Sequence, residues 1–171
     1  MAGTSAESTP KKNRLAEAVK TVLQIFTPAA VAFVLFTFVL GIGSVHGSSM
    51  EPLYNDSTMA IFYRWSEVER QDIVLVDSAA LGEMIIKRVV ALPGDRVSIQ
   101  NGVVYLNGAA LDEPYVAYHG GPDLAELTVP EETIFVLGDN RAVSLDSRAL
   151  GPVPDSEVMG TVLFSFQFPF S

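Results

Sequence analysis

The 171-residue sequence contains no cysteine and only two histidines. Disulfides, zinc–thiolate sites and cysteine nucleophiles are therefore excluded, and the sequence gives no sign of its redox compartment. His46 and His119 lie far apart and lack the spacing of a zinc site. The acidic loop 139–148 lacks the glycine and terminal glutamate of a calcium-binding EF-hand. We therefore expect neither a metal ion nor another cofactor.

The chain also lacks basic residues, with 11 Lys and Arg against 20 Asp and Glu and a net charge of −9. Nucleic acid is not the predicted partner, because phosphate binding requires a basic surface. The charge is uneven. Residues 1–21 have four basic and two acidic side chains, a net charge of +2, and the remainder carries −11. A basic tail and an acidic body separated by an apolar run are typical of a membrane-anchored protein.

The apolar run is Val22–Ile42, which has no charged residue and matches the roughly 20 residues that cross a bilayer. We expect a disordered cytoplasmic tail at 1–14, a transmembrane anchor at 15–43 and an extracytoplasmic domain at 44–171. A cleaved secretory signal is the alternative, but its apolar region spans only about 7–15 residues and ends at an Ala-x-Ala-like site. The basic tail favours a cytoplasmic N-terminus.

The rest of the chain is mainly β, and we predict an antiparallel, barrel-like sheet preceded by one transmembrane helix. Residues 97–132 are predicted as a small hairpin and loop insertion, in which two Asn-Gly steps indicate hairpins and 112–130 form a loop. Residues 158–170 alternate, so that Val162, Phe164, Phe166, Phe168 and Phe170 share one face. We expect that face in the core; contact of its aromatic end with lipid is the alternative. The other predicted strands are 58–65, 72–76, 84–92 and 133–137.

Lys87 stands in the middle of the apolar strand 84–92, which Pro93-Gly94 ends. Burial lowers the pKa of a lysine, and a lysine that is neutral near pH 7 serves as a general base. The alternative is an edge-strand lysine that reaches out to water. Ser48 and Ser49 also allow two interpretations. A bare Ser-Ser pair is more typical of a turn, and the alternative is that one of them is a nucleophile. The sequence has no Gly-x-Ser-x-Gly elbow, so a serine nucleophile here needs a base other than histidine, and Lys87 is the best candidate.

Three segments carry a family resemblance: Ser49–Leu53, Lys87–Asp95 and Gly138–Arg148. In order and spacing, and in the anchor before them and the Gly151-Pro152-Val153 after them, they closely resemble the conserved segments of bacterial type I signal peptidases. The resemblance covers roughly residues 20–170. Any one segment is modest support, whereas three in order behind a membrane helix are strong support.

The resemblance implies a plasma-membrane Ser/Lys protease that removes signal peptides from exported preproteins at the outer surface of the bilayer. Ser49 would be the nucleophile, Lys87 the general base and Ser144 the residue that hydrogen-bonds and orients the lysine. The cut would follow an Ala-x-Ala-type site in an extended peptide. The remaining implied roles are an Asp146–Arg148 ion pair, support of the same loop by Asp139 and Arg141, and a substrate cleft at Gly47, Ser48 and Met50.

The sequence departs from the family pattern in two places. Gly47 stands where many members have a hydroxyl residue that helps to bind the oxyanion, so the sequence leaves the second oxyanion donor unassigned. Ala142 and Val143 replace a polar pair, and we expect altered packing there without loss of the chemistry.

Two other functions are alternatives. A relative of the self-cleaving repressors would share the dyad and the β-fold, but those proteins are cytosolic and DNA-linked, which the apolar run and the acidic balance oppose. A membrane-anchored binding module without catalysis is disfavoured by the joint presence of Ser49, Lys87 and Ser144.

Overall fold

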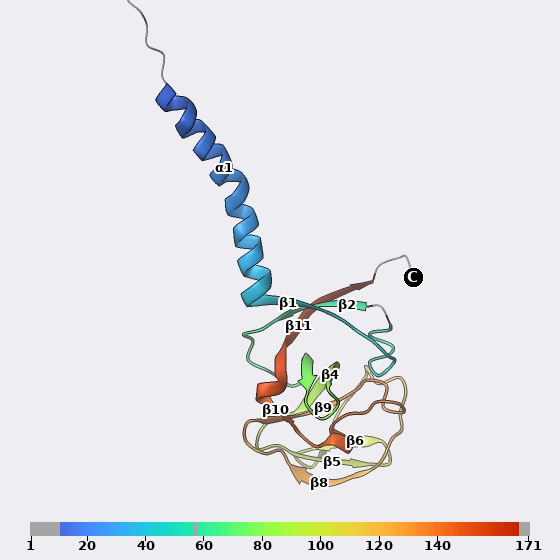
Figure 1. Cartoon of the computed structure of the whole chain (residues 1–171). Coiled ribbons are helices and arrows are strands. Elements are labelled where there is room, and N and C mark those ends of the chain that lie inside the picture. The colour runs from blue at the N-terminus through green and yellow to red at the C-terminus, as the bar shows by residue number, and fades with distance from the viewer. Residues whose placement is uncertain (1–10, 57, 168–171) are drawn as a thin grey trace, which may run out of the picture. The chain divides into compact units, whose positions relative to one another are not determined.

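A computed structural model of the chain describes residues 11–56 and 58–167, with side chains from 16 to 166 apart from 57 (Figure 1). The chain divides into two compact units, Met1–Phe38 and Val39–Ser171. The predicted disorder of residues 1–10 and the positions of Phe168 and Phe170 lie outside the described residues.

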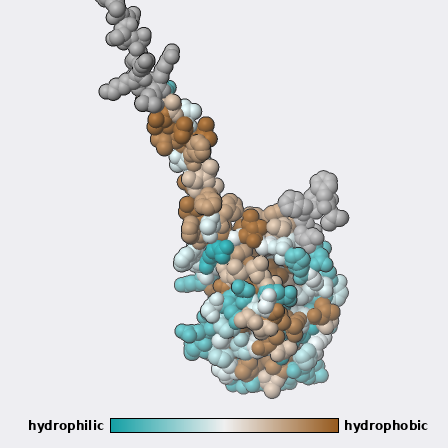
Figure 2. All heavy atoms as spheres, viewed as in Figure 1, coloured by the Kyte–Doolittle hydropathy of each residue, from teal (hydrophilic) through white to brown (hydrophobic). Residues whose placement is uncertain are grey.

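The first unit is a single helical segment. Helix α1 spans Lys11–Val34 and continues as the π-helical turn η1, Leu35–Val39. The stretch Ala16–Val39 is long and apolar enough to cross a membrane; at 1.5 Å per residue it spans about 36 Å, against about 30 Å for the hydrocarbon core. Its surface is covered by hydrophobic side chains (Figure 2). Pro28 lies inside the helix without ending it.

The boundaries of this segment differ from those predicted at both ends. Residues 11–14, assigned to the disordered tail, belong to α1. The end of the apolar run, Leu40–Ser44, is not helical but forms strand β1, paired with β2. Gly41 explains why: it lies against the ring of Phe62, where a side chain would collide. The two glycines of this stretch also weaken a helix.

The second unit contains a seven-stranded antiparallel sheet in the order β1-β2-β11-β3-β4-β9-β10. Figure 1 shows β1, β2 and β11 at one end of this unit and the strands of a second, smaller sheet at the other. The main-sheet strands are β2 Thr58–Tyr63, β3 Ile73–Ser78, β4 Glu83–Ala91, β9 Thr133–Leu137, β10 Val153–Pro154 and β11 Val158–Gln167. Two short helices, α2 Ser147–Leu150 and 3₁₀-helix η2 Asp155–Glu157, flank β10. The predicted mainly β fold behind one apolar helix is confirmed.

The smaller sheet has the order β7-β6-β5-β8 and corresponds to the predicted insertion. Its strands are β5 Arg96–Gln100, β6 Val103–Leu106, β7 Ala109–Ala110 and β8 Leu124–Thr128. Asn101 and Asn107 both have positive φ at the hairpin turns, as their Asn-Gly steps predict. The prediction of a loop throughout 112–130 is wrong, because β8 pairs with β5. Its short sequence, Leu-Ala-Glu-Leu-Thr, does not alternate cleanly and gives a weak strand signal, so pairing with β5 supplies the order.

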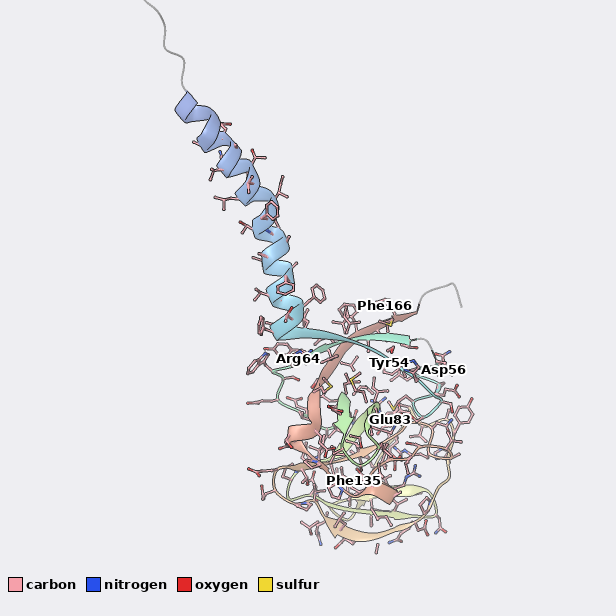
Figure 3. The ribbon with its side chains drawn as sticks, viewed as in Figure 1. Tyr54, Asp56, Arg64, Glu83, Phe135 and Phe166 are labelled. Carbon is pink, nitrogen blue, oxygen red and sulfur yellow. The ribbon has the colours of Figure 1, made fainter. Side chains whose placement is uncertain are left out.

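The core of the domain is aliphatic and aromatic, with Phe62, Phe135 and Val89 fully buried (Figure 3 labels Phe135). The prediction that β11 buries its aromatic face is wrong for the described residues. Phe164 is 56% exposed and Phe166 is 37% exposed. The pairing of β11 with β2 shifts register between Val162 and Phe164, and an irregularity of this kind changes which side chains face the core.

Strand β4 is paired on both sides over only part of its length. It pairs with β3 from Glu83 to Arg88 but with β9 only from Arg88 onward. The N–H and C=O of Val89 both bond toward the β3 side, to Asp72 and Gln71. Because these groups alternate along an antiparallel strand, those of Met84 and Ile86 point to the other edge. The first half of β4 therefore offers an open strand edge.

Asp95 joins the end of β4 to the small sheet. Its carboxylate accepts two hydrogen bonds from Arg70 (2.9 and 2.7 Å), one from Asn107 (2.8 Å) and one from the Leu92 N–H (2.8 Å). Burial alone would raise the pKa of Asp95, but these donors outweigh it and hold the pKa at about 2.

We predict that Asp95→Asn destabilises the domain above pH 4 and that its deficit shrinks as pH falls through 4 to 2. A carboxylate whose folded pKa lies below its unfolded value stabilises the fold above the unfolded pKa and ceases to do so once protonated. Since Arg70 is half exposed, solvent reduces the effect to about 1–2 kcal/mol. Denaturant unfolding of both chains in detergent, followed by circular dichroism across this pH range, measures it. An equal deficit at pH 6 and pH 2 would contradict the assignment.

Candidate active site

Ser49 and Lys87, 38 residues apart in the sequence, are in contact. Lys87 lies on β4 and is only 3% exposed. Its Nζ donates hydrogen bonds to Ser49 Oγ at 2.8 Å and to the carbonyl of Ile86 at 3.0 Å. Burial lowers the pKa of Lys87 to about 8, although the carboxylates of Asp146 and Glu83 act in the opposite direction. A substantial fraction of this amine is therefore neutral near physiological pH.

A tight turn between β1 and β2 holds Ser49. Gly47 has a φ of 82°, which favours glycine, and its N–H donates to Asp56 Oδ1 at 2.5 Å. The Tyr54 N–H donates to the Met50 carbonyl at 2.9 Å. From the other side of the site, the Asn140 N–H donates to the Ser49 carbonyl at 3.0 Å. Ser49 itself is half-buried, so its hydroxyl is positioned yet accessible.

Ser144 is close to this pair in the fold but is not bonded to Lys87. Its hydroxyl is buried, and within the described part of the chain it has no hydrogen-bond partner. It lies against Gly138, where any Cβ would overlap both Ser144 Oγ and the Ser49 carbonyl. The hydrogen bond from Lys87 to Ser144 that the resemblance implies is thus not formed in this structure, where the Lys87 amine bonds to Ser49 and Ile86 instead. The orienting role of Ser144 stays a prediction.

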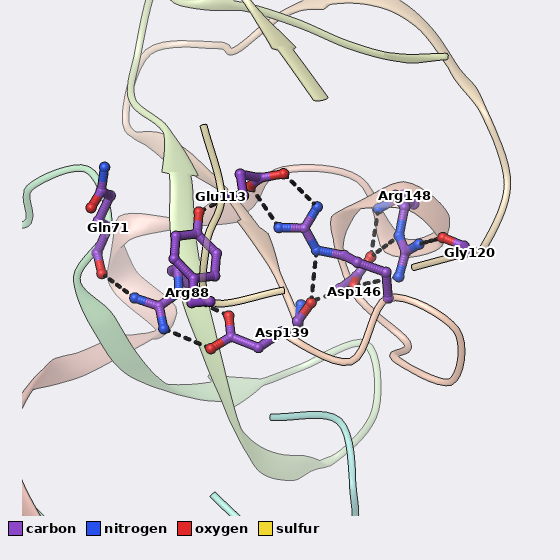
Figure 4. A network of polar contacts seen from close by, with 10 residues as sticks. Gln71, Arg88, Glu113, Gly120, Asp139, Asp146 and Arg148 are labelled. Carbon is purple, nitrogen blue, oxygen red and sulfur yellow. Dashed lines mark hydrogen bonds and ion pairs between the residues drawn. The ribbon is translucent and has the colours of Figure 1, made fainter. Parts of the chain in front are cut away.

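Asp146 and Arg148 form a buried ion pair beside the site (Figure 4). Arg148 donates from Nε and Nη2 to the two carboxylate oxygens at 2.8 and 2.9 Å, a bidentate geometry. Asp146 also accepts from the Gly138 N–H at 3.1 Å. Arg148 Nη1 donates to the Gly120 carbonyl at 3.0 Å. These bonds fix the loop after β9 that carries Ser144.

Asp139 and Arg141, predicted to support the same loop, pair with two different partners (Figure 4). Asp139 accepts two hydrogen bonds, at 2.8 and 2.6 Å, from Arg88, the residue next to Lys87. Arg141 donates to both oxygens of Glu113 at 2.6 and 3.0 Å. Tyr115 joins the two pairs: its ring lies 3.9 Å below the Arg88 guanidinium, and its hydroxyl donates to Glu113 at 2.9 Å.

Sequence reasoning missed Arg88, Glu113 and Tyr115. Burial and the neighbouring Glu113 carboxylate raise the pKa of Tyr115, so its phenol stays protonated and remains a donor. Glu113 and Tyr115 stand in the stretch that we assigned to a loop, where a lone carboxylate and a lone tyrosine give no signal of a buried partner. Only the apolar surroundings of Arg88 in its strand could have indicated a buried ion pair.

A groove leads from the Ser49–Lys87 pair along β4. Gly47 and Ser48, which we predicted at the substrate cleft, are among its lining residues, together with others of the β1–β2 connection and of β4. The assignment of Met50 to the cleft surface is wrong: Met50 is fully buried, packed with Val45 and Ile86, which do line the groove. Val143, which with Ala142 replaces the polar pair of the family pattern, is exposed and lines the groove. Its full lining is Ser44–Ser49, Leu75, Leu81, Glu83–Lys87, Val143 and Leu145.

A serine hydroxyl bonded to a buried lysine amine, at one end of a groove in a β-domain behind an apolar helix, defines a candidate serine hydrolase of the lysine-base type. Comparison with known proteins agrees. The family described as "Signal peptidase, peptidase S26" matches residues 18–167. Signal peptidase I of Bacillus licheniformis is 34% identical over 98% of this chain and 96% of its own length. Signal peptidase IB of Staphylococcus aureus strain COL is 32% identical over 89% of this chain and 92% of its own length.

The crystal structure of a signal peptidase I from Enterococcus faecalis V583 is also similar, with 34% identity and a TM-score of 0.51. The aligned region covers 56% of this chain and 97% of the Enterococcus faecalis chain. The chain therefore belongs to the signal peptidase family S26, whose members are serine endopeptidases. The predicted family and enzyme class are confirmed, and the apolar helix is consistent with membrane anchoring.

We predict that Glu113→Gln destabilises the domain by about 3 kcal/mol, because it leaves the buried Arg141 guanidinium without its counter-ion. Glu126→Gln is the matched control, since the Glu126–Arg96 pair is more than half exposed at both ends and should cost less than about 0.5 kcal/mol. Denaturant unfolding of the three chains measures the difference. Equal midpoints for the two variants would show that the Glu113–Arg141 pair does not support the fold.

Proposed function

We propose that this protein cleaves signal peptides from preproteins with Ser49 as nucleophile and Lys87 as general base. The supporting observation is the 2.8 Å contact between Lys87 Nζ and Ser49 Oγ, made by an amine that is almost wholly removed from water. Serine is a weak nucleophile until a base accepts its proton. Among the described residues, neither His46 nor His119 is hydrogen-bonded to Ser49, whereas Lys87 is.

The reaction proceeds in two stages. In the neutral dyad the Ser49 hydroxyl donates to the Lys87 amine, which takes the proton as Oγ attacks the carbonyl carbon of the scissile peptide bond. The resulting ammonium gives a proton to the departing amine, leaving an ester on Ser49. A water molecule, deprotonated by Lys87, then attacks the ester carbonyl; the bond to Ser49 Oγ breaks, Lys87 returns the proton to Oγ, and the signal peptide leaves as a carboxylate. The backbone N–H of Ser49 is the proposed donor to the oxyanion.

Ion pairs around the dyad position it. Asp139 binds Arg88, the residue after Lys87, and so holds this part of β4 at the loop that follows β9. Asp146 bonds to the Gly138 N–H and to Arg148 in the same loop. Arg141 adds a bond to the Gly138 carbonyl at 2.9 Å. Ser144 is the proposed partner of the Lys87 ammonium formed during the reaction, since its buried hydroxyl has unused bonding capacity.

The substrate would bind as an added strand. The open edge of β4 presents the backbone groups of Met84 and Ile86 along the groove that ends at Ser49. An extended peptide placed there has its scissile carbonyl at the nucleophile. A preference for small residues at the last and third-last positions before the cut, as in Ala-x-Ala, is part of the proposal and is what the family resemblance implies. The buried Val45 and Ile86 give the groove an apolar floor that suits such residues.

The proposed location is the plasma membrane, with the N-terminus in the cytoplasm and the catalytic domain on the outer side. The four basic residues before the apolar segment, and none within Thr21–Val39, support this orientation by the positive-inside rule. Exported preproteins reach that side of the membrane, where the catalytic domain meets the segment to be cut.

We predict that Ser49→Ala and Lys87→Ala each remove cleavage of a preprotein in detergent, lowering kcat/KM by about 10³-fold or more, while the chain stays folded. Ser48→Ala is the matched control, because Ser48 is an exposed neighbour in the same turn and its hydroxyl is not the one bonded to Lys87. Gel analysis of product and circular dichroism measure both properties. Substantial cleavage by the Lys87→Ala chain would end the dyad proposal.

The pH dependence of the reaction gives a second prediction. Only the neutral amine accepts the Ser49 proton, and the pKa of Lys87 is about 8. The kcat/KM should therefore level off above pH 8 and fall about tenfold per pH unit well below it. Initial rates with one peptide substrate from pH 5 to 9.5 give the profile. A flat profile over this range would contradict a lysine base.

A further inference from the structure

Glu83 is the acidic side chain of the groove. It is the first residue of β4, exposed, and lines the groove at the far end of the strand segment from Lys87 (Figure 3). Among the described residues it forms no ion pair and no side-chain hydrogen bond. Its carboxylate still acts on the Lys87 amine, whose pKa it raises. The carboxylate is thus free to meet a charge that enters the groove.

The position of Glu83 along β4 determines which part of a substrate it meets. Glu83 and Lys87 are four residues apart and share one face of the strand. Their Cα atoms are therefore about 13 Å apart along β4. A peptide paired with the open edge advances by the same distance per residue. When the residue before the scissile bond lies beside Lys87, the residue beside Glu83 is the fifth before that bond, and the fourth is its direct neighbour.

The groove lining contains few ionisable side chains. Of its lining residues, Glu83 and Lys87 are the ionisable groups besides His46, and Lys87 is committed to Ser49. Nothing cationic in the lining accompanies Glu83 at its end of the groove. A substrate side chain there meets one exposed carboxylate, which attracts a cation and repels an anion over a few ångströms.

We propose that Glu83 is a specificity-determining residue, which favours Lys or Arg and disfavours Asp or Glu at the fourth or fifth residue before the cut. The inference rests on the proposed function, because it requires the signal-peptide side of the substrate to lie along β4. It extends that function beyond the small residues next to the scissile bond. The Glu83 carboxylate would bind the substrate's Lys or Arg side chain and would take no part in the chemical steps.

A different role for Glu83 makes a distinguishable prediction. By raising the pKa of Lys87, the carboxylate also influences the base. If Glu83 acted only through the pKa of Lys87, replacing it would change the cleavage rate of every substrate by the same factor and would shift the pH profile. A specificity role instead changes the ratio of rates between substrates that differ in charge at one position.

The test uses the full chain in detergent and a set of peptides with one Ala-x-Ala site. The peptides carry Lys, Gln or Glu at the fourth or at the fifth residue before the cut, and competition at a fixed pH gives their relative kcat/KM. We expect the Lys peptide to be cleaved about fivefold faster than the Glu peptide at one of the two positions, as for a partly exposed ion pair. The ratio should fall toward one in 1 M salt.

Three variants complete the experiment. Glu83→Gln should bring the Lys-to-Glu ratio close to one, and Glu83→Lys should invert it. Asp77→Asn is the matched control: Asp77 is an exposed acid on β3 opposite Met84, outside the groove lining, so its loss should leave the ratio unchanged. Both positions are exposed, so the fold should tolerate the changes.

The outcomes separate the two proposals. Cleavage of all peptides at equal rates by the unmodified chain would overturn the role of Glu83 and leave the proposed function intact. The same ratio in Glu83→Gln as in the unmodified chain would also overturn it. No cleavage of any Ala-x-Ala peptide would instead refute the proposed function itself.

Discussion

The burial of one amine beside one hydroxyl is the constraint on which the site depends. Lys87 is 3% exposed and its pKa is about 8 instead of the usual 10.5. Holding a lysine in this state opposes folding by about 3 kcal/mol at 1.36 kcal/mol per pKa unit. The surrounding structure has to supply that energy through packing. Met50 and Val89 are fully buried on opposite faces of the β4 region and contribute to this packing. An amine so placed is a usable base, because burial disfavours its protonated, charged form.

The ion pairs and the open strand edge complement this burial. The site needs a rigid wall on one side, and the Arg88–Asp139 and Arg141–Glu113 pairs provide it by tying β4, the loop after β9 and the 112–118 segment together. It also needs an entrance, and before Arg88 the edge of β4 that faces away from β3 has no partner strand. A fully paired β4 would bury Lys87 as well but would leave no edge for a peptide. Under the proposed function, both features serve the binding and cleavage of a peptide.

Much of this could be predicted from the sequence, where the information is local. The strand 133–137 was predicted with the bounds that β9 has, and Ser49 and Lys87, singled out by their segments, are in contact. Information that depends on distant partners was not predicted. Strand β8 exists because β5 pairs with it, and Glu113 is buried because Arg141 meets it. Met50 lies beneath the groove, and the aromatic face of β11 is exposed because of a register shift, which no alternation pattern indicates.

The most direct test of the account is the pKa of the Lys87 amine itself in the full chain. The ¹⁵Nζ chemical shift of lysine, followed against pH in detergent and assigned by comparison with Lys87→Ala, reports this value without any substrate. We expect a midpoint near pH 8, well separated from those of the exposed lysines. A midpoint above pH 10 would show an amine charged throughout the working range, and the proposed catalytic role of Lys87 would then be wrong.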